Sequence, residues 1–349
     1  MIHHGFITHQ TVNGRDVDTF YKELLTVVGT VPLAMVRKRH ASRRGDPLPA
    51  ILLIHGFGQN RYAWHLPSRS FANHLARAGF DVFNVDLRGH GRSRELGPAR
   101  MGTLEEYYRE DLPAAIDEVR SHIGKDAPLY LVGHSLGGLV SYASAPALGD
   151  AIAGIATIGS PFAFGDGSHA VLRGLSFAAK FANRNGLPNI KMSLREVSTA
   201  LRSIRAIAEM RLYPIPIRGW HRGALEPLVL DEHLRLAFDH VGLGEFTELV
   251  SAQLFREGSS ETEAFSRLEL PLLVIAGTND DLAPPRSVKK AFDRSRSKEK
   301  TYLELPFGHI DLLVGRNAPD TTWRSVTEWA RKLATARGFS PDLPTKKSA

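Results

Sequence analysis

Short apolar segments alternate along the chain with longer segments in which apolar residues recur at helical spacing. The short segments are rich in Val, Ile and Leu and occupy 50–54, 80–85, 129–132, 152–158, 271–276 and 301–305. Helical patterns lie at about 67–78, 103–123, 136–147, 285–293 and 319–335. Strands that are apolar throughout are typical of a parallel sheet covered by helices on both faces. The pattern therefore predicts an α/β fold with a doubly wound, mostly parallel sheet.

This alternation stops between about 160 and 267, an interval too long for a plain loop. Its patterns are helical, at 171–183, 194–209, 230–239 and 244–256, and we expect an inserted helical cap or lid. The predicted organisation is a first core part, the cap, a second core part and a flexible tail, at 1–160, 161–266, 267–337 and 338–349. Residues 1–45 are expected to add strands at one edge of the sheet.

Composition supports a folded, globular chain. Of the 349 residues, 43% are hydrophobic and 23% charged, which provides enough apolar material for a large buried sheet. The absence of cysteine excludes disulfides, thiolate metal sites and a cysteine nucleophile. The N-terminus lacks the pattern of a signal peptide, and no apolar run approaches the roughly 18 residues that cross a bilayer. We expect a cytoplasmic, soluble protein.

The formal net charge of +7 raises the question of an anionic partner. The densest basic run covers 37–40 and continues at Arg43 and Arg44, just before a Gly-Asp-Pro turn signal. We interpret this run as a solvated hairpin, with a nucleic-acid or anionic-membrane patch as the alternative. Aromatic residues that could stack on bases are not interleaved with it, so no nucleic-acid partner is expected.

The strongest chemical signal lies at 133–137, which read Gly-His-Ser-Leu-Gly. This segment follows the apolar run 129–132 and opens a helical pattern. A serine in a tight strand-to-helix turn needs small neighbours, and Gly133, Gly137 and Gly138 supply them. The start of the new helix also directs free N–H groups toward the reacting centre. Ser135 is therefore the candidate nucleophile, the alternative being a glycine-rich turn that only links strand to helix.

A second segment, His-Gly-Phe-Gly at 55–58, directly follows the apolar run 50–54. Acyl transfer creates an oxyanion that needs two preorganised N–H donors. The backbone N–H groups of Phe57 and Leu136 are the candidates. His55 is interpreted as a structural histidine that supports the loop rather than as a base.

Two later segments could supply the acid and the base. Asp280 and Asp281 follow the apolar run 271–276, and His309 follows the run 301–305. Neighbouring side chains in an extended turn diverge, so only one of the two aspartates can point toward the histidine. Asp311 is expected to hydrogen-bond locally or to contact the cap, without a catalytic role.

Spaced glycines at 86–93 could suggest a phosphate loop. The segment lacks the pattern G-x-x-x-x-G-K-[ST] and does not match G-x-G-x-x-G. It is therefore interpreted as a tight structural turn that borders the pocket.

Together these segments resemble the α/β-hydrolase superfamily over roughly 45–160 and 266–335. In that pattern the acid stands three residues after Gly277 and four before Pro284, which selects Asp280. His309 matches the histidine of the terminal Gly-His, and the chain order Ser, Asp, His is that of α/β hydrolases. The resemblance implies a catalytic triad of Ser135, Asp280 and His309.

Within the superfamily, 80–89 and 308–315 look like a bacterial lipase- and esterase-like group. That group is similar to acid lipases and, more distantly, to polyhydroxyalkanoate synthases, which carry a cysteine where this chain has Ser135. Haloalkane dehalogenases and epoxide hydrolases carry an aspartate there. The implied function is hydrolysis of carboxylic esters through an acyl-enzyme, with no metal or organic cofactor.

Several alternatives stay open at this point. The same triad could act on thioesters, lactones or amides, or the fold could serve binding without catalysis. We expect a small ester with an apolar acyl or alcohol part. The aromatic residues Phe162, Phe164, Trp220 and Phe246 either line its pocket or pack the cap against the core. The oligomeric state does not follow from the sequence.

Overall fold

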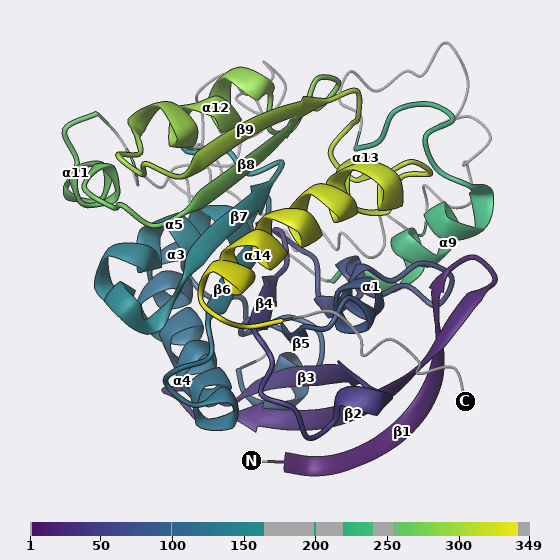
Figure 1. The fold of residues 1–349 in the computed structure, drawn as a ribbon. Coiled ribbons are helices and arrows are strands. Elements are labelled where there is room, and N and C mark those ends of the chain that lie inside the picture. The colour runs from purple at the N-terminus through teal and green to yellow at the C-terminus, as the bar shows by residue number, and fades with distance from the viewer. Residues whose placement is uncertain are drawn as a thin grey trace.

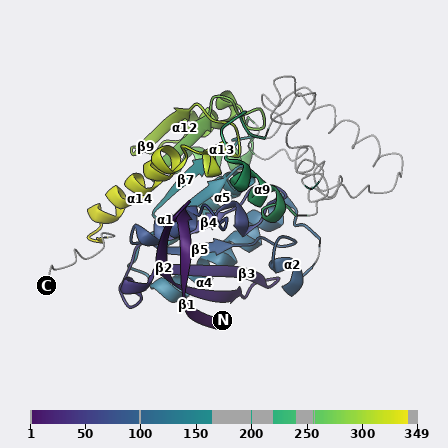
Figure 2. The same cartoon turned by 90° about the vertical axis from the view of Figure 1, so that its right-hand side faces the viewer.

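The computed structural model describes residues 2–98, 100–163, 199, 219–239, 255 and 257–340. These form a nine-stranded sheet in the order β1-β2-β3-β5-β4-β6-β7-β8-β9 (Figure 1). The strands are β1 (Ile2–Asn13), β2 (Asp16–Val27), β3 (Leu33–His40), β4 (Ala50–Ile54), β5 (Asp81–Val85), β6 (Leu129–His134), β7 (Gly154–Ile158), β8 (Leu272–Gly277) and β9 (Lys300–Leu305). Both views place β8 and β9 at the top and β1 to β3 at the bottom (Figure 1 and Figure 2).

The strands from β4 to β9 are those that the apolar runs predict, and they pair in parallel. This confirms the doubly wound α/β fold. The strands β1, β2 and β3 add an antiparallel edge, which joins the parallel part through β3 and β5.

Helices cover both faces of the sheet. They are α1 (Phe71–Arg77), α2 (Ser93–Leu96), α3 (Leu104–Glu106), α4 (Leu112–Ile123), α5 (Leu136–Leu148), α9 (Pro227–Leu236), α11 (Ser260–Ser266), α12 (Pro285–Arg294), α13 (Asp311–Val314) and α14 (Arg324–Ala336). Short helical turns lie at Ala41–Arg43, Arg61–Ala63, Tyr107–Asp111, Gly149–Ala151 and Pro319–Trp323.

Alternation along the strands divides the core into two layers. In β4, Ile51 and Leu53 pack in one cluster with residues of α1, α9 and α14. Leu52 and Ile54 pack in the other cluster with residues of α4, α5 and α12. Because successive side chains of a strand point to opposite faces, each strand of the parallel part contributes to both layers. The parallel strands, whose carboxyl ends carry the candidate site, are therefore packed on both faces.

The predicted cap range is described only in part. The helix α9 falls on the expected helical segment 230–239 and packs against the core, and α11 packs near α5. The expected helices at 171–183, 194–209 and 244–256 lie outside the described residues apart from Thr199 and Phe255. The domain boundaries stay a prediction.

The interpretation of the basic run as a solvated hairpin is wrong. Arg37, Lys38 and Arg39 belong to β3 and are all buried. Strand alternation directs the two arginines to one face, where both bond Asp81, at 2.8 and 2.5 Å for the closest nitrogen–oxygen pairs. Arg37 also pairs with Glu23 at 2.9 Å. The buried carboxylates balance these arginines, which is why the segment does not need water.

Candidate active site

Ser135 occupies a sharp turn between β6 and α5. Its backbone has φ 52° and ψ −116°, a conformation that residues with a side chain rarely adopt. The turn is fixed from both sides, since Ser135 N donates to the Ile158 carbonyl and Gly138 N donates to the Ser135 carbonyl, each at 3.1 Å. The serine is thus presented at the carboxyl end of β6.

The glycines around this turn are required by close backbone approach. A methyl group at Gly133 would collide with the backbone of Gly137 and Gly138. One at Gly137 would collide with the carbonyl oxygen of Ile54 on the adjacent strand. Small residues therefore allow α5 to start directly against β4 and β6.

The loop after β4 lies beside Ser135. The strands β4 and β6 pair in parallel with Ile54 opposite Gly133, so their carboxyl ends reach the same edge. A methyl group built at Gly56 would lie 3.2 Å from Ser135 Cβ. Phe57 follows in this loop and Leu136 is the first residue of α5, so both candidate oxyanion donors belong to segments that flank the serine.

His55 connects this loop to the turn after β5. Its Nε2 accepts a hydrogen bond from Leu87 N at 3.1 Å, and its Nδ1 donates to the Gly56 carbonyl at 2.9 Å. Burial, reinforced by the nearby His90, lowers the pKa of His55 to about 3. A neutral imidazole with both nitrogens engaged fits the structural role expected for this residue.

Asp280 and His309 meet at the carboxyl ends of β8 and β9, which pair in parallel with Gly277 opposite Leu305. The His309 Nδ1 donates to Asp280 Oδ2 at 2.7 Å, and both side chains are buried. The other carboxylate oxygen, Oδ1, accepts hydrogen bonds from Leu282 N at 2.9 Å and Ala283 N at 2.8 Å. With its proton on Nδ1, His309 has Nε2 available as the basic nitrogen.

The same contacts distinguish Asp280 from its neighbour Asp281. Asp280 is buried and turned toward the histidine, whereas Asp281 is partly exposed. The structure therefore places the residue selected by the motif spacing, and not its neighbour, against His309.

The turn that carries Ser135 and the histidine–aspartate pair lie on either side of β7. A methyl group at Gly159, just after β7, would lie 3.2 Å from Asp280 Oδ2 and 3.3 Å from His309 Nδ1. His134, the residue before Ser135, has its ring centroid 4.6 Å from that of His309, and its Nε2 donates to the His309 carbonyl at 3.3 Å. All three candidate residues thus converge at one edge of the sheet.

Asp311 fixes the loop that carries His309. Its Oδ2 accepts hydrogen bonds from Gly308 N at 2.9 Å and from His221 N at 2.7 Å. The sequence analysis expected Asp311 either to hydrogen-bond locally or to contact the cap. It does both, because Gly308 is local and His221 belongs to the predicted cap range. Burial raises the pKa of Asp311 to about 6, although these two N–H groups act in the opposite direction.

Two residues near the site were not singled out by the sequence. Gln59 Oε1 accepts from Gly56 N at 3.2 Å, and its Nε2 lies 3.5 Å from Nε2 of His233 on α9. His233 is fully buried, and burial lowers its pKa to about 3, with a smaller effect from His309. The only available signal was the helical pattern at 230–239, which does not identify the partner of a buried histidine.

The turn at 86–93 is structural, as expected. Gly89 and Gly91 have φ of 74° and 46°, where glycine is favoured. The Asp86 carboxylate accepts from Arg92 N at 3.0 Å, which closes the turn on itself, and from Arg61 N at 2.7 Å, which ties the turn to the segment after β4.

The four aromatic residues that the sequence analysis considered for the pocket lie in different surroundings. Phe162 is buried and packs against Phe255 and Phe265, with ring centroids 4.5 and 5.0 Å away, so the packing alternative holds for it. Trp220 is buried in the core layer that contains α9. Phe164 and Phe246 lie outside the described residues.

Within the described ranges, no group of three or more His, Cys, Asp or Glu side chains is placed to hold a metal ion. The described helices include none that is both long enough and apolar enough to cross a membrane.

The fold and these motifs define an α/β hydrolase, and the comparison with known families agrees. The alpha/beta hydrolase fold family matches residues 49–316, so the chain belongs to that family.

Similar proteins include named lipases. The chain is 27% identical to the monoglyceride lipase of Mus musculus over 305 residues, which cover 86% of this chain and 88% of that protein. It is 24% identical to the poly(3-hydroxyalkanoate) polymerase subunit PhaC of Haloferax mediterranei, a match that covers 85% of this chain but 62% of that relative's length. The solved monoacylglycerol lipase of Paleococcus ferrophilus has a TM-score of 0.56 at 19% identity, covering 95% of this chain and 99% of that one.

Proposed function

We propose that this protein is a serine hydrolase that cleaves carboxylic esters through a covalent acyl-enzyme. Ser135 is the nucleophile, His309 the general base and Asp280 the acid that orients it. The observation that carries the proposal is the 2.7 Å bond between His309 Nδ1 and Asp280 Oδ2, beside a serine held at positive φ. Similarity to a monoglyceride lipase supports an ester with an apolar acyl part.

In the first step, His309 Nε2 takes the hydroxyl proton while Ser135 Oγ attacks the ester carbonyl carbon. The negative charge that develops on the carbonyl oxygen is stabilised by the N–H groups of Phe57 and Leu136. Asp280 stabilises the imidazolium that forms. His309 then gives its proton to the departing alcohol, which leaves Ser135 acylated.

In the second step, water replaces the alcohol. His309 takes a proton from the water as its oxygen attacks the acyl carbonyl, and the same two N–H groups stabilise the second oxyanion. The bond to Ser135 Oγ breaks, the serine recovers its proton from His309, and the carboxylic acid is released.

The same chemistry extends to thioesters, lactones and amides, which differ in their leaving group. A binding protein without catalysis is the alternative of a different class. It is opposed by the buried Asp280 carboxylate, whose oxygens are both occupied in holding an imidazole and its own loop. Buried titratable groups with specific charge partners cluster at catalytic sites, which favours catalysis over binding alone.

The test replaces Ser135 with Ala and measures turnover of 4-nitrophenyl butyrate and of a monoacylglycerol. Turnover is expected to fall at least a thousandfold, and labelling by a fluorophosphonate probe, read by intact mass, is expected to disappear. Ser144→Ala is the matched control, since Ser144 lies in α5, the helix that follows Ser135, and donates to the Tyr108 carbonyl at 2.7 Å. Undiminished turnover in folded Ser135→Ala would remove Ser135 from the mechanism.

A further inference from the structure

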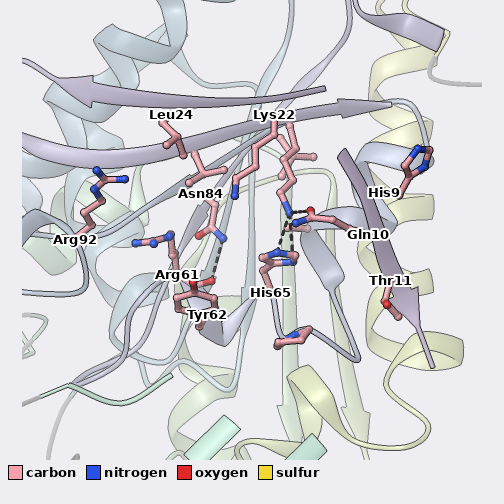
Figure 3. A pocket seen from close by; sticks show the side chains of 15 residues that line it. His9, Gln10, Thr11, Lys22, Leu24, Arg61, Tyr62, His65, Asn84 and Arg92 are labelled. Carbon is pink, nitrogen blue, oxygen red and sulfur yellow. Dashed lines mark hydrogen bonds between the residues drawn. The ribbon is translucent and has the colours of Figure 1, made fainter. Parts of the chain in front are cut away.

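A cavity of about 460 Å³ lies between the antiparallel edge of the sheet and the segment that follows β4 (Figure 3). It shares no lining residue with the candidate active site. Its fifteen described lining side chains include no carboxylate, and six are cationic or can become so, namely His9, Lys22, Lys38, Arg61, His65 and Arg92. A volume in this range suits a small molecule.

Lys22 and Lys38 face each other directly across the β2–β3 pair. Like charges opposite one another in an antiparallel pair destabilise it. Burial, and then neighbouring cations, lower the pKa of both lysines. This direction of shift means that the described part of the fold supplies no anion to compensate the charged lysines, so an anion bound in the cavity would favour their charged forms.

Lys38 is held in place by neutral acceptors. Its Nζ donates to Gln10 Oε1 at 2.7 Å, to Asn73 Oδ1 at 2.8 Å and to His65 Nε2 at 3.0 Å. Because His65 Nε2 accepts, its Nδ1 carries the proton and donates to Ser70 Oγ at 2.7 Å. These bonds fix the position of the ammonium group but leave its charge uncompensated.

The two arginines have carboxylate partners, unlike the lysines. Arg61 pairs with buried Asp86, and Arg92 lies 4.0 Å from exposed Glu95. No ion pair joins Lys22 to a carboxylate of the described residues, and its Nζ lies 5.6 Å from the centroid of the Phe6 ring. The unbalanced charge of the cavity is thus that of the two lysines.

Asn84 adds an independent sign of a missing partner. It lines the cavity and is buried, and its Nδ2 donates to the Arg61 carbonyl at 3.0 Å. Its Oδ1 is buried without a hydrogen-bond partner among the described residues. Buried polar atoms are almost always paired, so this wall is built to receive a donor, such as a protonated phosphate oxygen or a hydroxyl group.

We propose that this cavity binds the phosphoryl group of a small soluble phosphate monoester. At neutral pH such a group carries close to two negative charges and three strong acceptor oxygens. It would therefore balance Lys22 and Lys38 together, with Arg61 and Arg92 at the wall. The proposal is independent of the ester hydrolysis proposed above, because the two sites share no residue.

The test is calorimetric titration with inorganic phosphate and with glycerol 3-phosphate at constant ionic strength set by chloride. Saturable binding and a rise in Tm with ligand concentration are expected. Lys22→Gln should weaken binding at least tenfold, and Lys22 is partly exposed, so the variant can fold. Lys125→Gln is the control, because it removes the same charge from an exposed turn.

Wild-type protein without saturable binding, or equal affinity in Lys22→Gln and Lys125→Gln, would overturn the proposal. Arg92→Gln, which also removes a largely exposed lining cation, should weaken binding in the same direction. A lipid source is tested with phosphatidic acid vesicles. If these vesicles bind wild type but not Lys22→Gln, and free phosphate does not bind, the proposal of a soluble ligand is overturned. Turnover of 4-nitrophenyl butyrate by Lys22→Gln should stay within twofold of wild type, which separates this test from the first.

Discussion

At the scale of single residues, the candidate site depends on Asp280, whose carboxylate oxygens are both engaged in hydrogen bonds. Asp280 uses one oxygen for His309 and the other for two backbone N–H groups. Its carboxylate can therefore neither rotate nor leave without breaking several bonds. This arrangement keeps the proton of His309 on Nδ1, and in the proposed mechanism the opposite nitrogen accepts the serine proton.

Asp280→Asn should lower kcat for 4-nitrophenyl butyrate by roughly a thousandfold or more, because an amide can hold the histidine in the wrong tautomer. Steady-state kinetics on variants with unchanged circular dichroism would measure this loss. Asp281→Asn changes the neighbouring, partly exposed carboxylate and should leave kcat close to that of wild type. Equal losses in the two variants would contradict the assignment of Asp280.

Sequence reasoning at this scale succeeded where a motif has a fixed spacing. The distance from Gly277 to Asp280 and on to Pro284 selected the aspartate that contacts His309. His233 escaped it because it reaches the site only through the docking of α9, and Gln59 escaped it because its hydrogen bond to Gly56 N has no sequence signature. Periodicity reveals which face of a helix is buried, but not what that face meets.

At the scale of elements, the apolar strands were predicted to within about two residues. Of these, β4 to β8 are buried on both faces, whereas the edge strand β9 is only partly buried. The expected helix at 103–123 is less regular. It comprises α3, a π-helical turn at Tyr107–Asp111 and α4. In this stretch the carboxylates of Glu106, Glu110 and Asp111 all contact the buried guanidinium of Arg88. These are tertiary contacts, and the helical spacing of apolar residues carries no information about them.

Asp311 is the first residue of α13 and accepts a hydrogen bond from His221 N, so its ionisation affects the stability of this part of the fold. Its pKa rises from an ordinary 3.8 to about 6 in the folded protein, mainly through burial. The folded state therefore binds more protons than the unfolded state between these values, and stability falls as pH rises from 4 to 6. The loss levels off above about pH 6.

Asp311→Asn removes this titration. Relative to the variant, wild type should lose roughly 2–3 kcal/mol of unfolding free energy between pH 4 and pH 7. Urea unfolding of both proteins across this range measures the difference. A difference that does not change with pH would show that Asp311 titrates normally.

At the scale of the whole molecule, the net charge of +7 gives a misleading picture of the surface. Arg37 and Arg39 of the basic run share one buried carboxylate, Asp81. Burial opposes the charge on Arg37, but the hydrogen bond and the charge of Asp81 outweigh it and raise the pKa of the arginine. The sequence could not reveal this pairing, because it depends on the register between β3 and β5.

Asp81→Asn leaves Arg39 buried without this carboxylate, and it should cost about 3–5 kcal/mol of unfolding free energy. Asp293→Asn breaks the pair with Lys289, in which both side chains are about half exposed, and it should cost at most about 1 kcal/mol. Urea unfolding followed by circular dichroism compares the two. Losses of similar size would mean that the buried network contributes no more than a surface pair.

The order of strands along the chain also governs when the candidate site can assemble during synthesis. His134 and His309 are in contact although 175 positions separate them, and β9, the last of the described strands in the sequence, pairs with β8. A nascent chain that has folded the turn at Ser135 but has not yet made β9 lacks the imidazole of His309. The histidine–aspartate pair can therefore form only after β9 has joined the rest of the parallel sheet.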